Sequence, residues 1–271
     1  RTWGAQHTLY LPHAADFIDL HPPRNDLACD VVFIGSVFDQ REQLAQLPAA
    51  LRDFIRELVE EVFSRFFTTP LSPPDFGGRV STETLPKGVE ADPALVSRYV
   101  YLEVNNRIRF EAIRRLLPFD LHVYGQPYWK DLLGEKDAAR CYRGMVDYHN
   151  SANVMASARV NLDVTSIQTH ASLGPRCFNV VAQRGCLLTD WREGLDHLFQ
   201  HGEGVLYYES WDEIPAFVEE CLEDPEKREE IVEKGRTRIL REHTFQHRAE
   251  TIISYLKKNR EQIEEACGRC S

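Results

Sequence analysis

Small, polar and basic residues gather between two apolar runs at 160–165 and 186–190, and their chemistry suits an anion. The connecting loop carries Ser166, Thr169, His170, Ser172 and Gly174. Arg176 follows in the first turn of the helix that we expect next. A helix start offers unpaired N–H groups and the positive end of a dipole, and an arginine adds charged, bidentate hydrogen bonds. The stretch therefore predicts a phosphate site, with an ordinary strand-to-helix loop as the alternative.

Other polar side chains in the chain leave alternatives open. His170 could bind a phosphate or a sugar hydroxyl, or it could be an ordinary loop histidine. Asp163 and Asp190 could form an acidic pair, but Asp190 could also cap the helix that follows it or pack at the end of its strand. The run from His243 to Arg248 is interpreted as a structural helix start with Thr244 as its N-cap.

Apolar runs that alternate with helical patterns predict a parallel β-sheet covered on both faces. The strands are expected at 30–35, 119–124, 141–146, 160–165, 186–189 and 205–208. The last helices are expected at 211–222, 226–242 and 245–258. The segment 41–118 interrupts the alternation, and its apolar spacing predicts a helical insertion with a proline-rich loop at 68–93. The fold class is therefore α/β, with an insertion after the first strand.

Composition excludes several classes of protein. A net charge of -10 over 271 residues disfavours nucleic acid as a partner, because phosphate neutralisation needs basic surface. No run of 18 apolar residues is present, so no membrane span is expected, and no signal peptide is visible. Neither the glycine fingerprint of dinucleotide-binding folds nor a P-loop occurs. Seven scattered cysteines, an odd number, favour a reducing compartment, and we expect the protein to be cytoplasmic.

Several short runs follow one another in a fixed order along the chain. They are Asp30-Val-Val-Phe-Ile-Gly-Ser, Val123-Tyr-Gly125, Asn161-Leu, Pro175-Arg-Cys-Phe-Asn, Ala182-Gln-Arg-Gly-Cys-Leu-Leu-Thr-Asp190, Gly202-Glu-Gly-Val-Leu-Tyr-Tyr-Glu-Ser-Trp-Asp-Glu213 and His243-Thr-Phe-Gln-His-Arg248. In this order they resemble the C-terminal half of a GT-B glycosyltransferase, of the CgeB-like, group 1 bacterial family. Tyr10-Leu-Pro-His-Ala-Ala-Asp16 resembles the linker that enters this half from the first domain.

The resemblance implies a division of the chain. In GT-B enzymes two Rossmann-like domains face each other, and the C-terminal one binds the nucleotide-sugar donor. Residues 1–29 would then be a linker from a missing N-terminal domain, consistent with a chain that begins at arginine instead of methionine. Residues 30–258 would be the Rossmann-like donor-binding domain, with 41–118 as its helical insertion, and 259–271 would be a tail.

The resemblance also assigns roles to particular residues. Gly35 and Ser36 match the turn after the first strand, and Gly125 matches the turn after the second. The loop residues that would meet the diphosphate are His170, Ser172 and Gly174. Arg176 and Asn179 match an Arg-x-Phe-acid/amide pattern, in which an acid at the last position often binds ribose hydroxyls. Arg184 stands where relatives commonly have glycine.

The function implied is a hexosyltransferase-like enzyme that moves a sugar from a nucleoside-diphosphate sugar, UDP-sugar above all, to an acceptor. The acceptor would be a protein, a glycan or a small molecule, and the catalytic base would come from the other domain. No bound cofactor or metal is expected, because helix dipoles and cationic side chains offset the leaving diphosphate. The alternative is a degenerate glycosyltransferase-like domain that acts as a binding or scaffold module.

Overall fold

A computed structural model describes residues 8–68, 80–168, 173–192 and 195–260. Six parallel strands form one sheet in the order β3-β2-β1-β4-β5-β6. The strands are β1 (Cys29–Ile34), β2 (Leu121–Tyr124), β3 (Tyr142–Gly144), β4 (Ala158–Leu162), β5 (Cys186–Asp190) and β6 (Val205–Tyr208). The expected α/β, Rossmann-like fold with a parallel sheet is confirmed.

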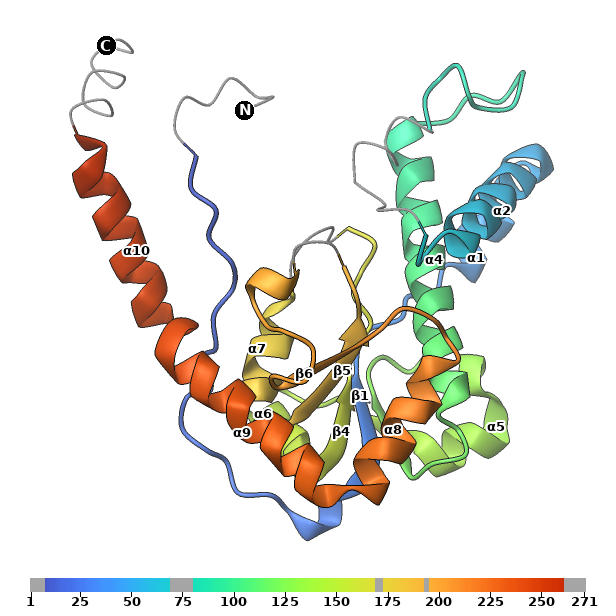
Figure 1. Cartoon of the computed structure of the whole chain (residues 1–271). Coiled ribbons are helices and arrows are strands. Elements are labelled where there is room, and N and C mark those ends of the chain that lie inside the picture. Colours follow the sequence, from blue (N-terminus) through green and yellow to red (C-terminus); the bar gives the residue numbers. More distant parts are fainter. Residues whose placement is uncertain (1–7, 69–79, 169–172, 193–194, 261–271) are drawn as a thin grey trace.

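Helices follow most of the strands and cover both faces of the sheet (Figure 1). The helices are α1 (Arg41–Ala45), α2 (Ala49–Ser64), α4 (Pro93–Arg115), α5 (Trp129–Cys141), α6 (Tyr148–Ser157), α7 (Pro175–Ala182), α8 (Glu213–Glu223), α9 (Pro225–Glu242) and α10 (Phe245–Lys258). Two short 3-10 helices are η1 (Asn25–Leu27) and η2 (Leu195–His197).

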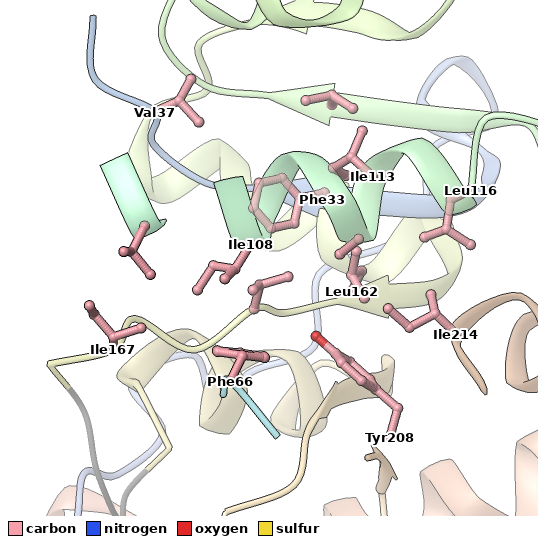
Figure 2. Packing of buried hydrophobic residues seen from close by; sticks show 14 of the residues in the cluster. Phe33, Val37, Phe66, Ile108, Ile113, Leu116, Leu162, Ile167, Tyr208 and Ile214 are labelled. Carbon is pink, nitrogen blue, oxygen red and sulfur yellow. The ribbon is translucent and has the colours of Figure 1, made fainter. Parts of the chain in front are cut away.

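The strands form where apolar side chains can be buried on both faces. Val31, Val32 and Phe33 of β1 are almost completely buried between β2 and β4. Helices α2, α4, α5 and α8 supply the larger apolar cluster on one face (Figure 2), and α6, α7 and α9 cover the other. Such continuous burial is the reason that a parallel strand reads as an unbroken apolar run.

Five strands differ from the expected bounds by one to three residues, and β4 and β3 are examples. β4 ends at Leu162 instead of residue 165, because the N–H of Thr165 bonds to the Asp190 carboxylate and not to a neighbouring strand. β3 is only Tyr142–Gly144, since Cys141 completes helix α5. Both differences arise at the ends of strands, where side chains compete with the ladder for backbone groups.

The insertion after β1 is helical as expected, and its long helix also covers the sheet. Helix α2 packs along α4, and Val104 and Ile108 of α4 are fully buried in the main cluster. Helix α4 begins at Pro93, and the Asp92 side chain caps it by accepting from the N–H of Ala94 at 2.9 Å. Residues 69–79 of the proline-rich loop lie outside the described residues.

Helix α9 passes close to the turn before β6, at two glycines. Gly204 has φ +84°, and a Cβ added to Gly235 would lie 2.4 Å from the Cα of Gly204. A separation below 3.0 Å cannot be accommodated without a shift of the backbone. Glycine at position 235 therefore allows α9 to approach the sheet.

We predict that Gly235→Ala destabilises the domain by about 1–3 kcal/mol, the range for overpacking. The direction of the change in unfolding free energy is informative, because Gly→Ala in an unobstructed helix stabilises by about 0.5–1 kcal/mol. The measurement is urea-induced unfolding, with Thr237→Ala at an exposed position of the same helix as control. The control should change the free energy of unfolding by less than about 0.5 kcal/mol. An unchanged or raised stability for Gly235→Ala would contradict the packing described.

Candidate functional site

The strand order reverses between β1 and β4, which makes this pair the switch point of the sheet. The chain runs from β1 to β2 and β3 on one side, then returns to β4, β5 and β6 on the other. Connections therefore leave the carboxyl ends of β1 and β4 in opposite directions, and open α/β sheets bind ligands at such a point. The residues that follow these two strands begin with Gly35 and Asp163, respectively. The candidate site is built around this edge.

Turns after β1 and β2 are held tightly against each other. The N–H of Gly35 donates to the Tyr124 carbonyl at 2.9 Å, and the Trp129 indole donates to the Gly35 carbonyl at 2.9 Å. A Cβ at Gly125 would lie 2.2 Å from that same carbonyl oxygen. Glycine at 125 is thus required by packing between the two turns, and Gly35 and Gly125 both lie at the carboxyl edge of the sheet.

Arg176 lies in the first turn of α7, beside the end of β4. Its Nη1 is 3.2 Å from Oδ1 of Asp163, and its side chain remains 39% exposed. The other carboxylate oxygen of Asp163 accepts from the Cys177 thiol at 3.4 Å. Gly174 is the N-cap residue of α7 and makes no side-chain cap. One face of the Arg176 guanidinium is therefore oriented by Asp163, while the rest is open to a ligand.

A second cation, Arg109, reaches this edge from helix α4 and was not predicted from the sequence. Its Nη1 donates to the Ser36 carbonyl at 2.5 Å. Burial lowers the pKa of this guanidinium from its usual value, the charge of Asp163 opposes that effect and the charge of Arg176 adds to it. Within the described residues, no carboxylate lies within ion-pair distance of Arg109.

Asp190 has a structural role that differs from capping the next helix. It forms a buried ion pair with Arg192 at 2.6 Å, and its other oxygen accepts from the N–H of Thr165 at 2.7 Å. Asp163 and Asp190 thus bind different cations, and no acidic pair forms between them. Their joint effect is to fix the loop after β4, which leads to Arg176.

Helix α4 also holds that loop from the other side. The Tyr101 hydroxyl lies 2.9 Å from the hydroxyl of Ser166, and the Asn105 side-chain oxygen accepts from the N–H of Ile167 at 3.1 Å. The insertion therefore forms one wall of the site. His170 and Ser172, which the sequence places in this loop, lie outside the described residues.

A hollow of about 500 Å³ opens beside the turns that follow β1 and β2. It is lined by Val37, Phe38, Asp39, Gln126, Pro127, Tyr128, Lys130 and Asp131. The Arg41 guanidinium stacks over the Tyr128 ring at 4.9 Å from its centroid. A larger hollow lies along α9, and a smaller one of about 350 Å³ lies between α2 and α4. Neither Arg109 nor Arg176 lines any of these three hollows.

Asn179 occupies a different environment from the one its predicted ribose role requires. Its side chain is 2% exposed, and its oxygen accepts from the N–H groups of Asp16 and Phe17 at 2.8 and 3.3 Å. The amide therefore holds the N-terminal segment against α7. Arg184, at the glycine-like position, has φ 60°, so the backbone does adopt the conformation that favours glycine there.

The run at 243–248 is structural, as expected. Thr244 is the N-cap of α10, and His247 completes a capping box with it. Arg248 donates to the carbonyls of Pro12 and His13 at 2.8 and 2.7 Å. This end of the chain thus fastens the N-terminal segment to α10.

The described residues contain neither a metal-binding cluster nor a membrane-spanning helix. No three His, Cys, Asp or Glu side chains in this part of the chain gather in a group that could hold a metal ion. None of its helices has both the length and the apolar character needed to cross a membrane.

Comparison with known proteins places the site in a family. Residues 106–254, more than half of the chain, match the family model described as glycosyl transferase-like. The matched region begins within α4 and continues into α10, so it includes Arg109, Gly125, Arg176 and Asn179. No curated protein matches the chain.

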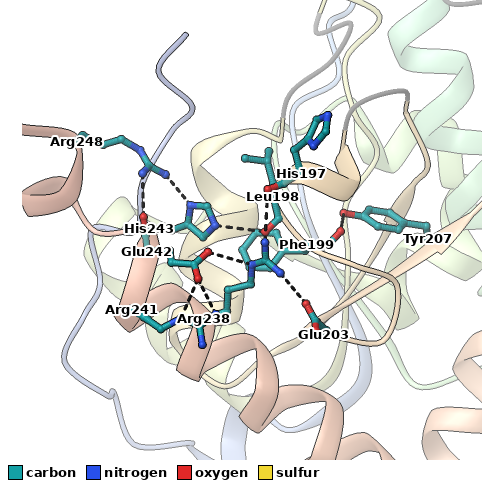
Figure 3. A network of polar contacts seen from close by, with 10 residues as sticks. All are labelled: His197, Leu198, Phe199, Glu203, Tyr207, Arg238, Arg241, Glu242, His243 and Arg248. Atoms are coloured by element: carbon teal, nitrogen blue, oxygen red, sulfur yellow. Dashed lines mark hydrogen bonds and ion pairs between the residues drawn. The ribbon is translucent and has the colours of Figure 1, made fainter. Parts of the chain in front are cut away.

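His243 is the buried titratable group at the centre of the contacts in Figure 3. Its Nδ1 accepts from Arg248 at 2.8 Å, so the proton lies on Nε2, which donates to the Leu198 carbonyl at 3.3 Å. Burial, with the nearby charge of Arg248, lowers the pKa of His243 to about 4. The unfolded chain, with a histidine pKa near 6.5, binds the proton more readily.

Acid should therefore destabilise the fold through this residue. The contribution of His243 is complete above about pH 6.5 and is lost as pH falls toward 4, by about 3 kcal/mol in total. We predict that His243→Gln flattens the fall in unfolding free energy between pH 6.5 and 4, measured by denaturant titration. His197→Gln, at an exposed histidine, is the matched control and should retain the wild-type slope. Equal slopes for wild type and His243→Gln would refute the assignment.

Proposed function

This chain belongs to the glycosyl transferase-like family, and from that premise we propose that it binds the nucleoside-diphosphate sugar of a glycosyl transfer reaction. The diphosphate would lie at the carboxyl edge between β1 and β4. Its oxygens would be held by Arg176, by Arg109 and by N–H groups at the start of α7. A UDP-sugar is the donor that we favour, in line with the family resemblance.

One observation carries this proposal: two guanidinium groups from distant segments meet at the switch point of the sheet. The charge of Arg176 lowers the pKa of Arg109, whereas Asp163, which pairs with Arg176, acts on Arg109 in the opposite direction. Asp163 offsets only one of the two positive charges, and the charge that remains in a partly buried site is unfavourable unless a further anion binds there. A diphosphate supplies that anion, and each charged hydrogen bond contributes about 1.5–3 kcal/mol.

The chemistry of transfer needs positive charge at this position. When an acceptor hydroxyl displaces the nucleoside diphosphate from the anomeric carbon, negative charge grows on the leaving phosphate oxygen. Arginines that are already oriented stabilise that charge without reorganising during the reaction. Asp163 orients Arg176 and the Ser36 carbonyl orients Arg109, so both cations are held in place beforehand. We propose that this occurs without a bound metal.

A general base must lie within hydrogen-bond reach of the acceptor and be free to take its proton. Asp163 and Asp190 are the two acids described after β4 and β5, and both are held in ion pairs. We propose that the base comes from a second domain across the cleft, in line with the two-domain arrangement that the resemblance implies. The acceptor, a protein, glycan or small molecule, would bind there too.

Isothermal titration with UDP tests the donor site. We predict that Arg176→Ala and Arg109→Ala each weaken binding by about 1.5–3 kcal/mol, roughly 10- to 100-fold. Arg107→Ala is the matched control, because Arg107 belongs to the same helix but pairs with Glu60 and stacks over the Phe63 ring. The control should bind UDP like wild type. If no common nucleoside diphosphate binds the folded wild-type chain, the binding or scaffold alternative replaces this proposal.

Transfer by the chain alone tests the proposed origin of the base. We predict slow release of UDP from a UDP-sugar and no glycosylated product, because the cations would remain while the base would be absent. The assay follows nucleotide release and product over a panel of UDP-sugars and acceptors, with Arg176→Ala to show that release depends on the site. Multiple-turnover transfer by residues 1–271 would show that the base lies within this sequence.

A further inference from the structure

Two buried cysteines face each other away from the donor site. Cys186 is the first residue of β5 and Cys221 lies in α8, and their Sγ atoms are 3.9 Å apart. Their exposed fractions are 1% and 4%. Both belong to the larger apolar cluster, so the pair bridges the sheet and the helix that covers it.

The surroundings make the two sulfurs unequal. The thiol of Cys186 hydrogen-bonds to Cys221, and that bond, helped by the nearby charge of Arg228, lowers the pKa of Cys221 against the effect of burial. The same bond together with burial raises the pKa of Cys186. Arg228 is fixed there because its guanidinium donates to the carbonyl of Cys221. With the Arg228 guanidinium held beside it, Cys221 is the sulfur that we expect to act as the nucleophile, and the Sγ atom of Cys186 lies 3.9 Å away.

A hollow lies beside Cys221. It measures about 320 Å³, and Cys221 forms part of its wall together with His201, Leu206, Lys227, Arg228 and Ile231, among others. Cys186 does not line it. A small reagent that enters this hollow would meet Cys221 first, whereas Cys186 is reached only through its partner.

We propose that Cys221 is a site of oxidation by hydroperoxides and that Cys186 is its resolving thiol. The Cys221 thiolate attacks one oxygen of hydrogen peroxide, the O–O bond breaks, and a sulfenic acid and hydroxide form. Cys186 then attacks the Cys221 sulfur and displaces its oxygen, which leaves as water with the thiol proton. Two thiols lose two electrons in total, and one peroxide becomes two waters. The product is a disulfide between β5 and α8.

The site is separate from the proposed donor site. Cys186 begins β5, whereas Asp190, which fixes the loop leading to Arg176, ends it. Oxidation at the far end of the strand leaves both site cations in place. The inference therefore does not rest on nucleotide binding, and the two can fail independently.

Peroxide treatment of the full chain tests the proposal, followed by alkylation under denaturing conditions and peptide mapping by mass spectrometry. Cys267→Ser/Cys270→Ser is the working background, because it removes the two tail cysteines and leaves five. We expect two of the five thiols to be lost, with one cross-linked peptide that joins positions 186 and 221. A folded chain in which both remain thiols, or in which Cys29 and Cys141 oxidise as fast, would overturn the proposal.

Single substitutions separate the two roles. In Cys186→Ser, a sulfenic acid should persist at Cys221 and be trapped by dimedone. In Cys221→Ser, Cys186 should stay reduced at the same peroxide concentration. Cys141→Ser, at another buried cysteine, should form the cross-link at the wild-type rate. Circular dichroism checks that each variant is folded. If a variant does not fold, the peptide mapping of the wild-type cysteines still tests whether positions 186 and 221 become cross-linked. Dimedone labelling at Cys186 instead of Cys221 would reverse the assignment and refute it.

Discussion

Pairing of β1 with β4 at the centre of the sheet is the constraint on which the other features depend. Val31, Val32 and Phe33 are paired with β2 on one side and with β4 on the other, so the chain must wind away from this strand in both directions. That reversal opens the edge where Gly35 and Asp163 follow their strands. Everything assigned to the site, including the start of α7, is placed by this pairing.

The insertion gives the site its second wall because α4 is bound to both loops at this edge. Asn106 accepts from the N–H of Phe38 and donates to its carbonyl, at 2.9 and 2.8 Å, which fixes the chain after β1. Tyr101 and Asn105 fix the loop after β4 in the same way. Arg109, on the same helix, donates to the Ser36 carbonyl after β1. Helix α4 thus connects the insertion to the two loops of the proposed donor site.

Strands and helices were predictable because their pattern lies in neighbouring residues of the sequence. Contacts between segments that are far apart in the sequence were not predictable. Apolar runs gave the six strands, and Arg184 was singled out because a bulky residue stood at a glycine-like position. Arg109 was missed because its contact with Ser36 spans 73 residues. The available signal was two consecutive asparagines, Asn105 and Asn106, buried within an apolar-spaced helix. The resemblance assigned Asn179 to the donor site, and nothing in the sequence indicated that its side chain holds the N-terminal segment, 163 residues away.

The central claim is that a diphosphate joins the two guanidinium groups at the switch point. A crystal structure of the chain with bound UDP measures this directly. The account predicts phosphate oxygens within hydrogen-bond distance of both Arg109 and Arg176, and next to the first turn of α7. Phosphates found along α9, in the hollow lined by Arg184 and Arg241, or touching neither of the two cations would contradict it.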